Sequence, residues 1–523
     1  MAKKFHAGDI YLGNSLFANS VFVSDQGIVT SEAEFLTSDI QQVINLKGNF
    51  LSPAFRDGHT HPLFAGRESR GLDISDCLTE AELIKKLKNY SESNPAMSWL
   101  DGAVFDRSLD MNFDRATLDK AVNNKPVVLH GDDHHTLWVN SKALEIAGLL
   151  SGRLPELESG SIDVDEDGMP TGIIRDWPAM SLVMNLAPKL TLEEDVAALL
   201  WADRKLAAAG IAECFDAWID KGMAETYLAA WQTGELSLDY TLGFRADPIT
   251  FNSDLPYFLE QRAALEQTQA QVRGTSIKFF ADGVFGSASA LVIDPYLSTG
   301  SHGQAIWPAG KFRDAIALAH KNGFQIHIHA IGDAATSLCL DVLAELENFT
   351  YPPVIAHAEL TDQSLLNRMA TSGVVACVQP YWAQNNGLLL SCQKHLGKER
   401  LERLYAFNDM FESGVTTVFS SDWPISSYEP SKGLAVAVNR REHSSQPRHN
   451  FAQAVRVEQA IAAYSRNVKL MLNSAETGTL EFGQPFDAVL LDQNPFEVAA
   501  EHLIKTKVLA TYKAGKEIFR ANL

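Results

Sequence analysis

The sequence predicts an α/β protein built on a (β/α)8 TIM barrel, with a small β-sandwich domain formed by both termini and an inserted subdomain. Three observations predict this fold. Strand-like segments occupy both ends of the 523-residue chain, apolar strand-like and helical segments alternate between them, and residues 70–205 form an interval too long for an ordinary βα connection.

Both ends consist of short strand-like segments broken by turn residues. These segments are residues 9–14, 20–27 and 42–48 near the start, and 486–492 and 508–516 near the end. Two terminal β segments can pair into one sheet domain, which would bring the chain ends together. We therefore expect a domain formed by residues 1–52 plus 476–523.

Eight apolar segments predict the buried strands of the barrel, over residues 53–475. They are residues 52–59, 211–217, 240–246, 275–281, 324–330, 353–358, 374–380 and 416–422. Helical patterns such as Leu192 to Ala209 separate most of them, and alternation of strand and helix implies a parallel sheet. Seven or nine strands fit the pattern too, but eight units form a closed barrel. We expect the 70–205 insertion to lie over one barrel mouth.

Composition excludes several classes of function. Lys and Arg number 44 against 65 Asp and Glu, so the net charge of −21 repels phosphate, and we expect neither nucleic acid nor membrane as partner. Five scattered cysteines do not suggest a disulfide framework. No signal peptide or membrane-spanning segment is evident. These features favour a cytoplasmic enzyme with a small-molecule substrate, and they leave open whether it forms a homo-oligomer.

The strongest chemical signal is an HxH pair, His59 and His61, at the end of the first predicted barrel strand. Residues i and i+2 of a strand share a face, so the two imidazoles can point at one divalent metal. The alternative is two polar residues that end a strand and bind nothing.

Further potential ligands occur in four other predicted strands. Lys278 lies in an apolar run, His329 and His357 end two strands, and Asp422 ends the last. Buried polar groups are costly unless paired or ligating. In a parallel barrel the carboxyl ends of all strands meet at one mouth, where active sites lie. The pattern therefore predicts a metal site at this mouth.

The order of these residues resembles that of the amidohydrolase superfamily: HxH on the first strand, Lys on the fourth, His on the fifth and sixth, and Asp on the eighth. Longer strings are similar to its YtcJ-like branch, which includes N-substituted formamide deformylases. They are Val139 to Leu144, Ala281-Asp282-Gly283, His329 to Asp333, and Ser421 to Pro424. The resemblance runs from about residue 5 to the C-terminus.

The resemblance implies a metal-dependent hydrolase of C–N bonds in amides or in N-acyl or N-formyl small molecules. By matching position, His59, His61 and Asp422 would ligate one metal, and His329 and His357 a second. Lys278 would bridge the two if carboxylated. An unmodified lysine is a poor ligand and would favour a single metal. The expected ion is zinc, as one or two ions.

The expected reaction is hydrolysis by metal-activated hydroxide, because zinc lowers the pKa of bound water to about 7 and polarises a carbonyl oxygen. Asp422 would act as general base and then as general acid. Two alternatives remain: a metal lactonase or esterase on the same site, and a non-catalytic ligand-binding barrel.

Several positions depart from the family pattern or carry weaker signals. Arg56 stands where the family has an apolar residue. His135 matches a histidine of the family's insertion and Asp282 lies just past Lys278, so we interpret both as substrate-binding candidates. The alternative for His135 is a surface histidine. His327 lies two residues before His329, where packing or a hydrogen bond to a ligand is favoured over ligation.

Overall fold

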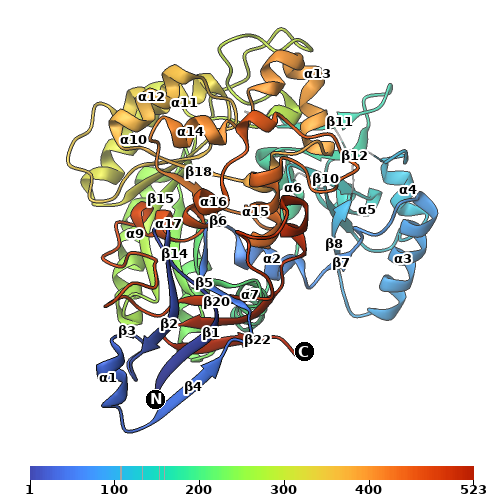
Figure 1. Ribbon diagram of the computed structural model, residues 1–523. Helices are drawn as coiled ribbons and strands as arrows, with labels where there is room; N and C mark the ends of the chain where they lie inside the picture. The colour runs from blue at the N-terminus through green and yellow to red at the C-terminus, as the bar shows by residue number, and fades with distance from the viewer. Residues whose placement is uncertain (106–108, 132–133, 152–153, 158–159, 523) are drawn as a thin grey trace. The chain divides into compact units, whose positions relative to one another are not determined.

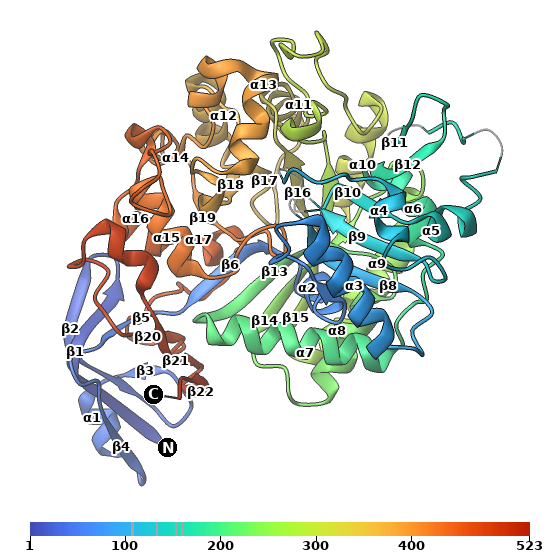
Figure 2. The same cartoon turned by 90° about the vertical axis from the view of Figure 1, so that its right-hand side faces the viewer.

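The computed structural model describes residues 1–522 except 106–108, 132–133, 152–153 and 158–159. The chain divides into two compact units (Figures 1 and 2). One combines Met1–Pro62 with Leu200–Leu523, and the other is Leu63–Leu199.

The first unit contains the predicted barrel, and the eight-strand prediction is confirmed. Its parallel strands, in spatial order, are β6 (Phe55–Thr60), β13 (Ile211–Ile219), β14 (Asp239–Arg245), β15 (Val272–Phe280), β16 (Gln325–Ala330), β17 (Val354–His357), β18 (Val375–Val378) and β19 (Thr417–Phe419). At the carboxyl end, the first and last strands are joined by backbone bonds from Asp422 N to His59 O (2.8 Å) and from His61 N to Trp423 O (2.8 Å). These bonds fix two predicted ligand segments against each other.

Helices alternate with these strands. They are α8 (Met223–Gln232), α9 (Phe251–Leu265), α10 (Ala309–Lys321), α11 (Asp333–Leu343), α12 (Gln363–Ser372), α13 (Gly387–Glu402), α14 (Phe407–Glu412), α15 (Pro430–Asn439), α16 (Val457–Ala463) and α17 (Arg466–Met471). Apolar side chains of several strands, including Phe215, Val354 and Val418, pack into one buried cluster. The barrel centre is therefore filled, as expected for strands rich in branched residues.

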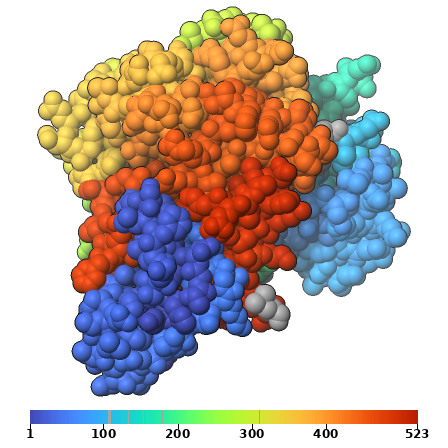
Figure 3. Space-filling model, in the orientation of Figure 1, coloured from blue at the N-terminus to red at the C-terminus, as the bar shows by residue number. Residues whose placement is uncertain are grey.

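Both chain termini contribute to one eight-stranded sheet. Its strands are β1 (Ala2–Gly13), β2 (Leu16–Val23), β3 (Val29–Thr30), β4 (Gln41–Asn45), β5 (Phe50–Pro53), β20 (Ala488–Leu491), β21 (Val508–Lys513) and β22 (Lys516–Arg520), with α1 (Glu32–Leu36) beside them. Phe5 stacks on Phe486 at 4.7 Å, so the two ends share one core. The space-filling view shows N-terminal and C-terminal residues side by side (Figure 3).

The predicted strand 52–59 divides between the two parts of this unit. β5 pairs with β1 and β20 in the terminal sheet, whereas β6 belongs to the barrel. Arg56 lies just past the junction, and its guanidinium binds Glu213 of β13 (3.2 Å) and Asp487 beside β20 (2.8 Å). A buried arginine at this position is therefore explained by ion pairs that link barrel and terminal sheet.

The second unit has its own sheet, in the order β11 (Ser161–Val164), β12 (Pro170–Arg175), β10 (Thr136–Val139), β9 (Val127–Gly131), β8 (Leu100–Phe105) and β7 (Leu72–Asp73). Its helices are α2 (Pro62–Glu68), α3 (Glu80–Ser93), α4 (Arg115–Asp119), α5 (Ser141–Ile146) and α6 (Trp177–Met184). The fully buried Trp138 belongs to its core. That this insertion covers the barrel mouth stays a prediction.

The predicted boundary at residue 205 falls within a helix. α7 (Leu192–Ala208) runs past the end of the second unit, and its later part belongs to the barrel unit. There Asp203 accepts hydrogen bonds from the backbone N–H groups of Ser237 and Leu238, just before β14. Among the described residues, no helix combines the length and the apolar character that a bilayer crossing requires.

Candidate metal centre

Three of the predicted ligands meet at the carboxyl end of the barrel. His59 of β6, His357 of β17 and Asp422 after β19 are all buried, and one potential ligand atom from each lies within 4.8 Å of the others. The three come from positions as far apart as 59 and 422 in the sequence. Their convergence follows from the parallel barrel, which places the carboxyl ends of its strands together.

His61 completes the contact between the first and last strands. Its Nε2 lies 3.0 Å from Asp422 Oδ1, and the Nε2 of His59 lies 3.5 Å from the same oxygen. Asp57 supports this arrangement, because its carboxylate accepts hydrogen bonds from the backbone N–H groups of His59 (3.2 Å) and Ser421 (3.0 Å). A single carboxylate thus holds both ligand segments.

The backbone at two of these residues adopts the left-handed region. φ is +73° at His357 and +55° at Asp422, a conformation uncommon for residues with a Cβ. Such strain persists where surrounding contacts enforce it, and it is concentrated at functional sites. Here it turns each side chain at the point where its strand ends.

Lys278 lies beside this group. Its Nζ is 3.5 Å from His59 Nε2, and the side chain is buried. Burial lowers the pKa of Lys278 to about 7, although Asp422 acts in the opposite direction. Near neutral pH a substantial fraction of this amine is therefore uncharged.

His329 lies at the edge of the cluster. Its ring centroid is 4.6 Å from that of His357, but its Nε2 lies 3.2 Å from the Gly283 carbonyl oxygen. It is therefore a neighbour of the three converging ligands, and its role as a ligand stays a prediction.

Each of the other histidines has a different partner behind it. His61 Nδ1 lies 3.6 Å from Asp216 of β13, His59 Nδ1 lies 3.0 Å from His327 Nε2, and His357 Nδ1 lies 2.9 Å from Gln379 Oε1. Two of these partners, Asp216 and Gln379, were not identified by the sequence analysis. Both lie in or directly after barrel strands. Many other polar residues share that position, so it does not distinguish these two.

The partners give the histidines different electrostatic properties. Burial lowers the pKa of His59 well below its ordinary value, and burial lowers that of His357 to about 4. Burial would also lower the pKa of His61, but its bonds to Asp216 and Asp422 raise it to about 9. Bonding to His61 lowers the pKa of Asp422 in spite of burial. The site therefore offers two neutral imidazoles and an ionised carboxylate, the donor types that divalent zinc binds.

The two substrate-binding candidates lie in different surroundings. Asp282 is buried, and its carboxylate accepts hydrogen bonds from the backbone N–H groups of Leu291, Ile331 and Gly332 at 2.8–3.0 Å. This geometry favours a role in holding the loop after β15. His135, in the second unit, lies 3.0 Å from Asp176 through its Nδ1. For both residues, contact with substrate stays a prediction.

Aromatic side chains lie beside the histidines. Trp382 stacks on His357 with ring centroids 5.7 Å apart and an interplanar angle of 2°. The ring centroid of Phe280 lies 5.1 Å from that of His329 and 4.9 Å from that of Trp218. The ring centroid of Trp218 lies 6.4 Å from that of His61. The cluster is thus bounded by apolar ring faces.

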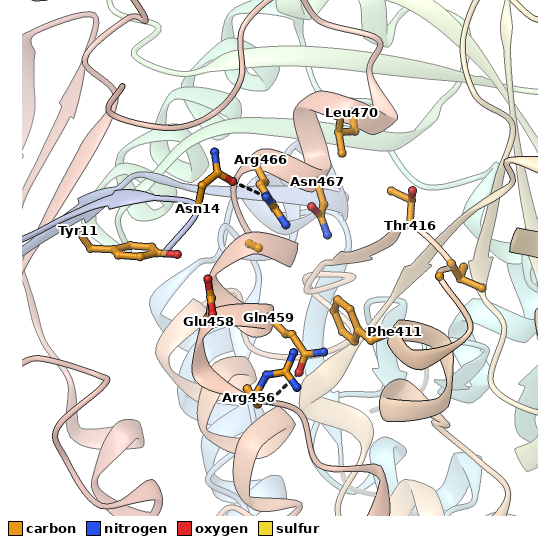
Figure 4. A pocket seen from close by; sticks show the side chains of 13 residues that line it. Tyr11, Asn14, Phe411, Thr416, Arg456, Glu458, Gln459, Arg466, Asn467 and Leu470 are labelled. Atoms are coloured by element: carbon orange, nitrogen blue, oxygen red, sulfur yellow. Dashed lines mark hydrogen bonds between the residues drawn. The ribbon is translucent and has the colours of Figure 1, made fainter. Parts of the chain in front are cut away.

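A separate pocket of about 420 Å³ lies where β19 begins, at the opposite end of that strand from Asp422. Side chains from β1, α16 and α17 line it, including Tyr11, Glu458 and Arg466 (Figure 4). Arg466 bonds to Asn14 there. None of the predicted ligands lines this pocket, so it is distinct from the candidate metal centre.

The eight parallel strands of the barrel and the histidine–carboxylate cluster at their carboxyl ends define a class of barrel proteins with a potential metal centre. Within that class, the chain belongs to the amidohydrolase family, whose model matches residues 42–519. This confirms the resemblance on which the ligand assignment was based.

Individual relatives are similar along nearly the whole chain. The Bacillus subtilis protein YtcJ, named as an amidohydrolase, is 25% identical, over 96% of this chain and 97% of its own. The N-substituted formamide deformylase of Arthrobacter pascens is also 25% identical, over 91% and 89%. A solved structure, an uncharacterized metal-dependent hydrolase from Pyrococcus horikoshii, shares the fold with a TM-score of 0.77 at 24% identity, over 96% and 99%.

Proposed function

We propose that this protein is a metal-dependent hydrolase of C–N bonds in amides or in N-acyl or N-formyl small molecules. The observation that carries the proposal is the convergence of His59, His357 and Asp422 within 4.8 Å at the barrel mouth. Family membership supports the hydrolase class, and the name of the Arthrobacter pascens relative supports the choice of amide substrate.

The residues fit a divalent ion. His59, His61 and Asp422 would hold one metal, and His329 and His357 a second. Lys278, carboxylated by CO2, would bridge them. An uncharged amine is the form that reacts with CO2, and the lowered pKa of Lys278 favours that form. Zinc as the ion, a cytoplasmic location and an insertion at the barrel mouth belong to the same proposal.

When bound, a divalent metal lowers the pKa of water and polarises a carbonyl oxygen. The chain supplies the proton transfers and the surroundings. Asp422 is buried and ionised, and its Oδ2 lies 4.0 Å from His357 Nδ1. We assign Oδ2 the proton of the attacking water and its delivery to the leaving nitrogen. The aromatic rings around the cluster limit access of bulk water and strengthen these interactions.

Elemental analysis and a substrate screen test the proposal together. The purified protein should contain about one or two divalent ions per chain, and chelation should abolish hydrolysis of N-formyl and N-acyl amines, with recovery when zinc is restored. A matched ester and amide pair separates amide hydrolysis from lactonase or esterase activity. Metal-free protein with full activity, or metal-loaded protein that hydrolyses neither substrate, would contradict the proposal.

A further inference from the structure

The segment directly after β18 carries two buried polar atoms that need a partner. Trp382 is 6% exposed and Gln384 is 1% exposed. Among the described residues, neither Trp382 Nε1 nor Gln384 Oε1 has a hydrogen-bond partner. One atom is a donor and the other an acceptor.

The position of this segment places Trp382 directly beside a candidate metal ligand, His357. Trp382 ends the short helix η3 (Pro380–Trp382), which follows β18 after a single residue, Gln379. Its ring lies parallel to that of His357, 5.7 Å away. Gln384 is tied to the same segment, because its backbone N–H donates to the Trp382 carbonyl (2.8 Å).

The orientation of the Gln384 amide is set by its other end. Gln384 Nε2 donates to the Tyr381 carbonyl oxygen (2.8 Å), which leaves Oε1 as the open acceptor. The Tyr381 hydroxyl is also close to Gln384. However, burial and the Glu442 carboxylate raise the pKa of that hydroxyl. The hydroxyl therefore stays protonated and donates its hydrogen bond to Glu442, not to Gln384 Oε1.

Two open polar atoms in a buried segment are energetically unfavourable. An unsatisfied buried donor or acceptor costs about 1–3 kcal/mol, and native proteins satisfy the large majority of such groups. A ligand that brings one acceptor and one donor would remove both costs. An amide with an N–H group has that pair of atoms.

We propose that this segment recognises the substrate, with Gln384 Oε1 accepting from an amide N–H and Trp382 Nε1 donating to a substrate oxygen. The inference rests on the proposed function and narrows it. The preferred substrates are N-formyl or N-acyl derivatives of primary amines, which carry an N–H. Esters, lactones and N-alkylated tertiary amides lack it and would leave Gln384 unpaired in a dry site, which is an effective basis for rejection.

The test compares an N-formyl primary amine with its N-methyl analogue in the metal-loaded protein. Wild type should prefer the N–H substrate in kcat/KM by about tenfold to a hundredfold, the equivalent of one lost buried hydrogen bond. Gln384→Met keeps the side-chain length and removes the acceptor. It should lower kcat/KM for the N–H substrate by that factor and leave the N-methyl analogue unchanged.

Trp382→Phe serves as the matched second variant. Phenylalanine keeps a ring against His357 and removes the N–H, so it should lower kcat/KM for both substrates and leave their ratio unchanged. Metal content measured by elemental analysis should equal that of wild type in both variants. An equal effect of Gln384→Met on the two substrates would overturn the inference, and would assign the two atoms to buried water.

Binding measurements keep this test separate from that of the proposed function. A non-hydrolysed urea and its N-methylated analogue are titrated into metal-loaded wild type and Gln384→Met. A preference for the N–H compound that disappears in Gln384→Met supports the recognition site even if no amide is hydrolysed. Amide hydrolysis without such a preference overturns only this inference.

Discussion

The residues behind the proposed metal-binding histidines differ in charge, and this difference affects each histidine. His61 faces the carboxylate of Asp216, whereas His59 faces the imidazole of His327 and His357 faces the amide of Gln379. Partners of this kind fix the tautomer and the ring orientation of a ligand. Because Gln379 Oε1 accepts from His357 Nδ1, the proposed ligand atom of His357 is the other ring nitrogen, Nε2.

Replacing Gln379 tests this positioning role. Gln379→Leu removes the acceptor for His357, and we expect metal affinity to fall about 10–100-fold. Gln379→Glu retains an oxygen acceptor at the same reach and should keep affinity close to wild type. Competition with a chromophoric chelator measures both. Equal affinity in Gln379→Leu and wild type would remove Gln379 from the metal site.

Replacing Asp422 tests the assigned proton transfer. Asparagine cannot accept a proton, so Asp422→Asn should lower kcat by about 10²–10⁴-fold with the circular dichroism spectrum unchanged. Asp362→Asn is the matched control. Asp362 caps α12 by accepting from Leu365 N, and asparagine caps a helix equally well. Full activity in Asp422→Asn would refute the proton transfer.

The sequence predicted His59, His357 and Asp422 as ligands because ionisable groups at strand ends are unusual and because their order resembles that of the amidohydrolase superfamily. The structure brings these three side chains together, and their binding of a metal stays a prediction. Asp216 and Gln379 were not predicted, because their roles depend on which strand lies beside which ligand. That information comes from three-dimensional packing and not from local pattern.

At the scale of elements, the alternation of strand and helix predicted all eight barrel strands, but strand ends were less well predicted. The segment 52–59 reads as one apolar strand, yet it crosses from the terminal sheet to the barrel within a few residues. Arg56 and Asp57 interrupt its apolar character. The partners of Arg56, Glu213 and Asp487, lie 157 and 431 residues away in the sequence. No local rule predicts ion pairs over such separations.

The Arg56 ion pairs predict a stability effect between these elements. Arg56→Met removes the guanidinium that pairs with Asp487 and one of the three cations around Glu213, which keeps Arg273 and Lys469. Breaking a buried pair costs about 3–5 kcal/mol. Arg56→Met with Asp487→Asn should recover part of this loss, because one uncompensated charge is removed. Urea unfolding measures the free energies, and metal content should stay unchanged in both variants. A stability equal to wild type in Arg56→Met would contradict the expected role.

At the scale of the whole molecule, the sequence predicted an insertion, and the structure resolves a unit with its own sheet and core. The predicted insertion spans 70–205, and the compact unit is Leu63–Leu199. At the later limit the helical pattern continues through α7 without a break. A continuous helix shared by two units carries no sequence signal at the boundary.

Acid stability of the whole molecule should depend on Glu213. Burial would raise the pKa of Glu213, but Lys469 and Arg56 lower it to about 2, against an ordinary value of 4.5. The carboxylate therefore stays ionised in the folded protein at a pH where the unfolded chain takes up a proton. Its contribution is complete above about pH 4.5 and is lost as pH falls toward 2, and a shift of this size corresponds to about 3 kcal/mol.

Glu213→Gln isolates this contribution from other acid effects. The net charge of −21 also changes as pH falls, but this change is nearly the same in both proteins and cancels in the difference. We expect wild type to exceed Glu213→Gln in free energy of unfolding by a constant amount from pH 7 to about pH 5. The difference should then shrink steadily toward pH 3 in urea titrations. A difference that stays constant down to pH 3 would mean that the pKa of Glu213 is not lowered, and that Lys469 and Arg56 do not outweigh its burial.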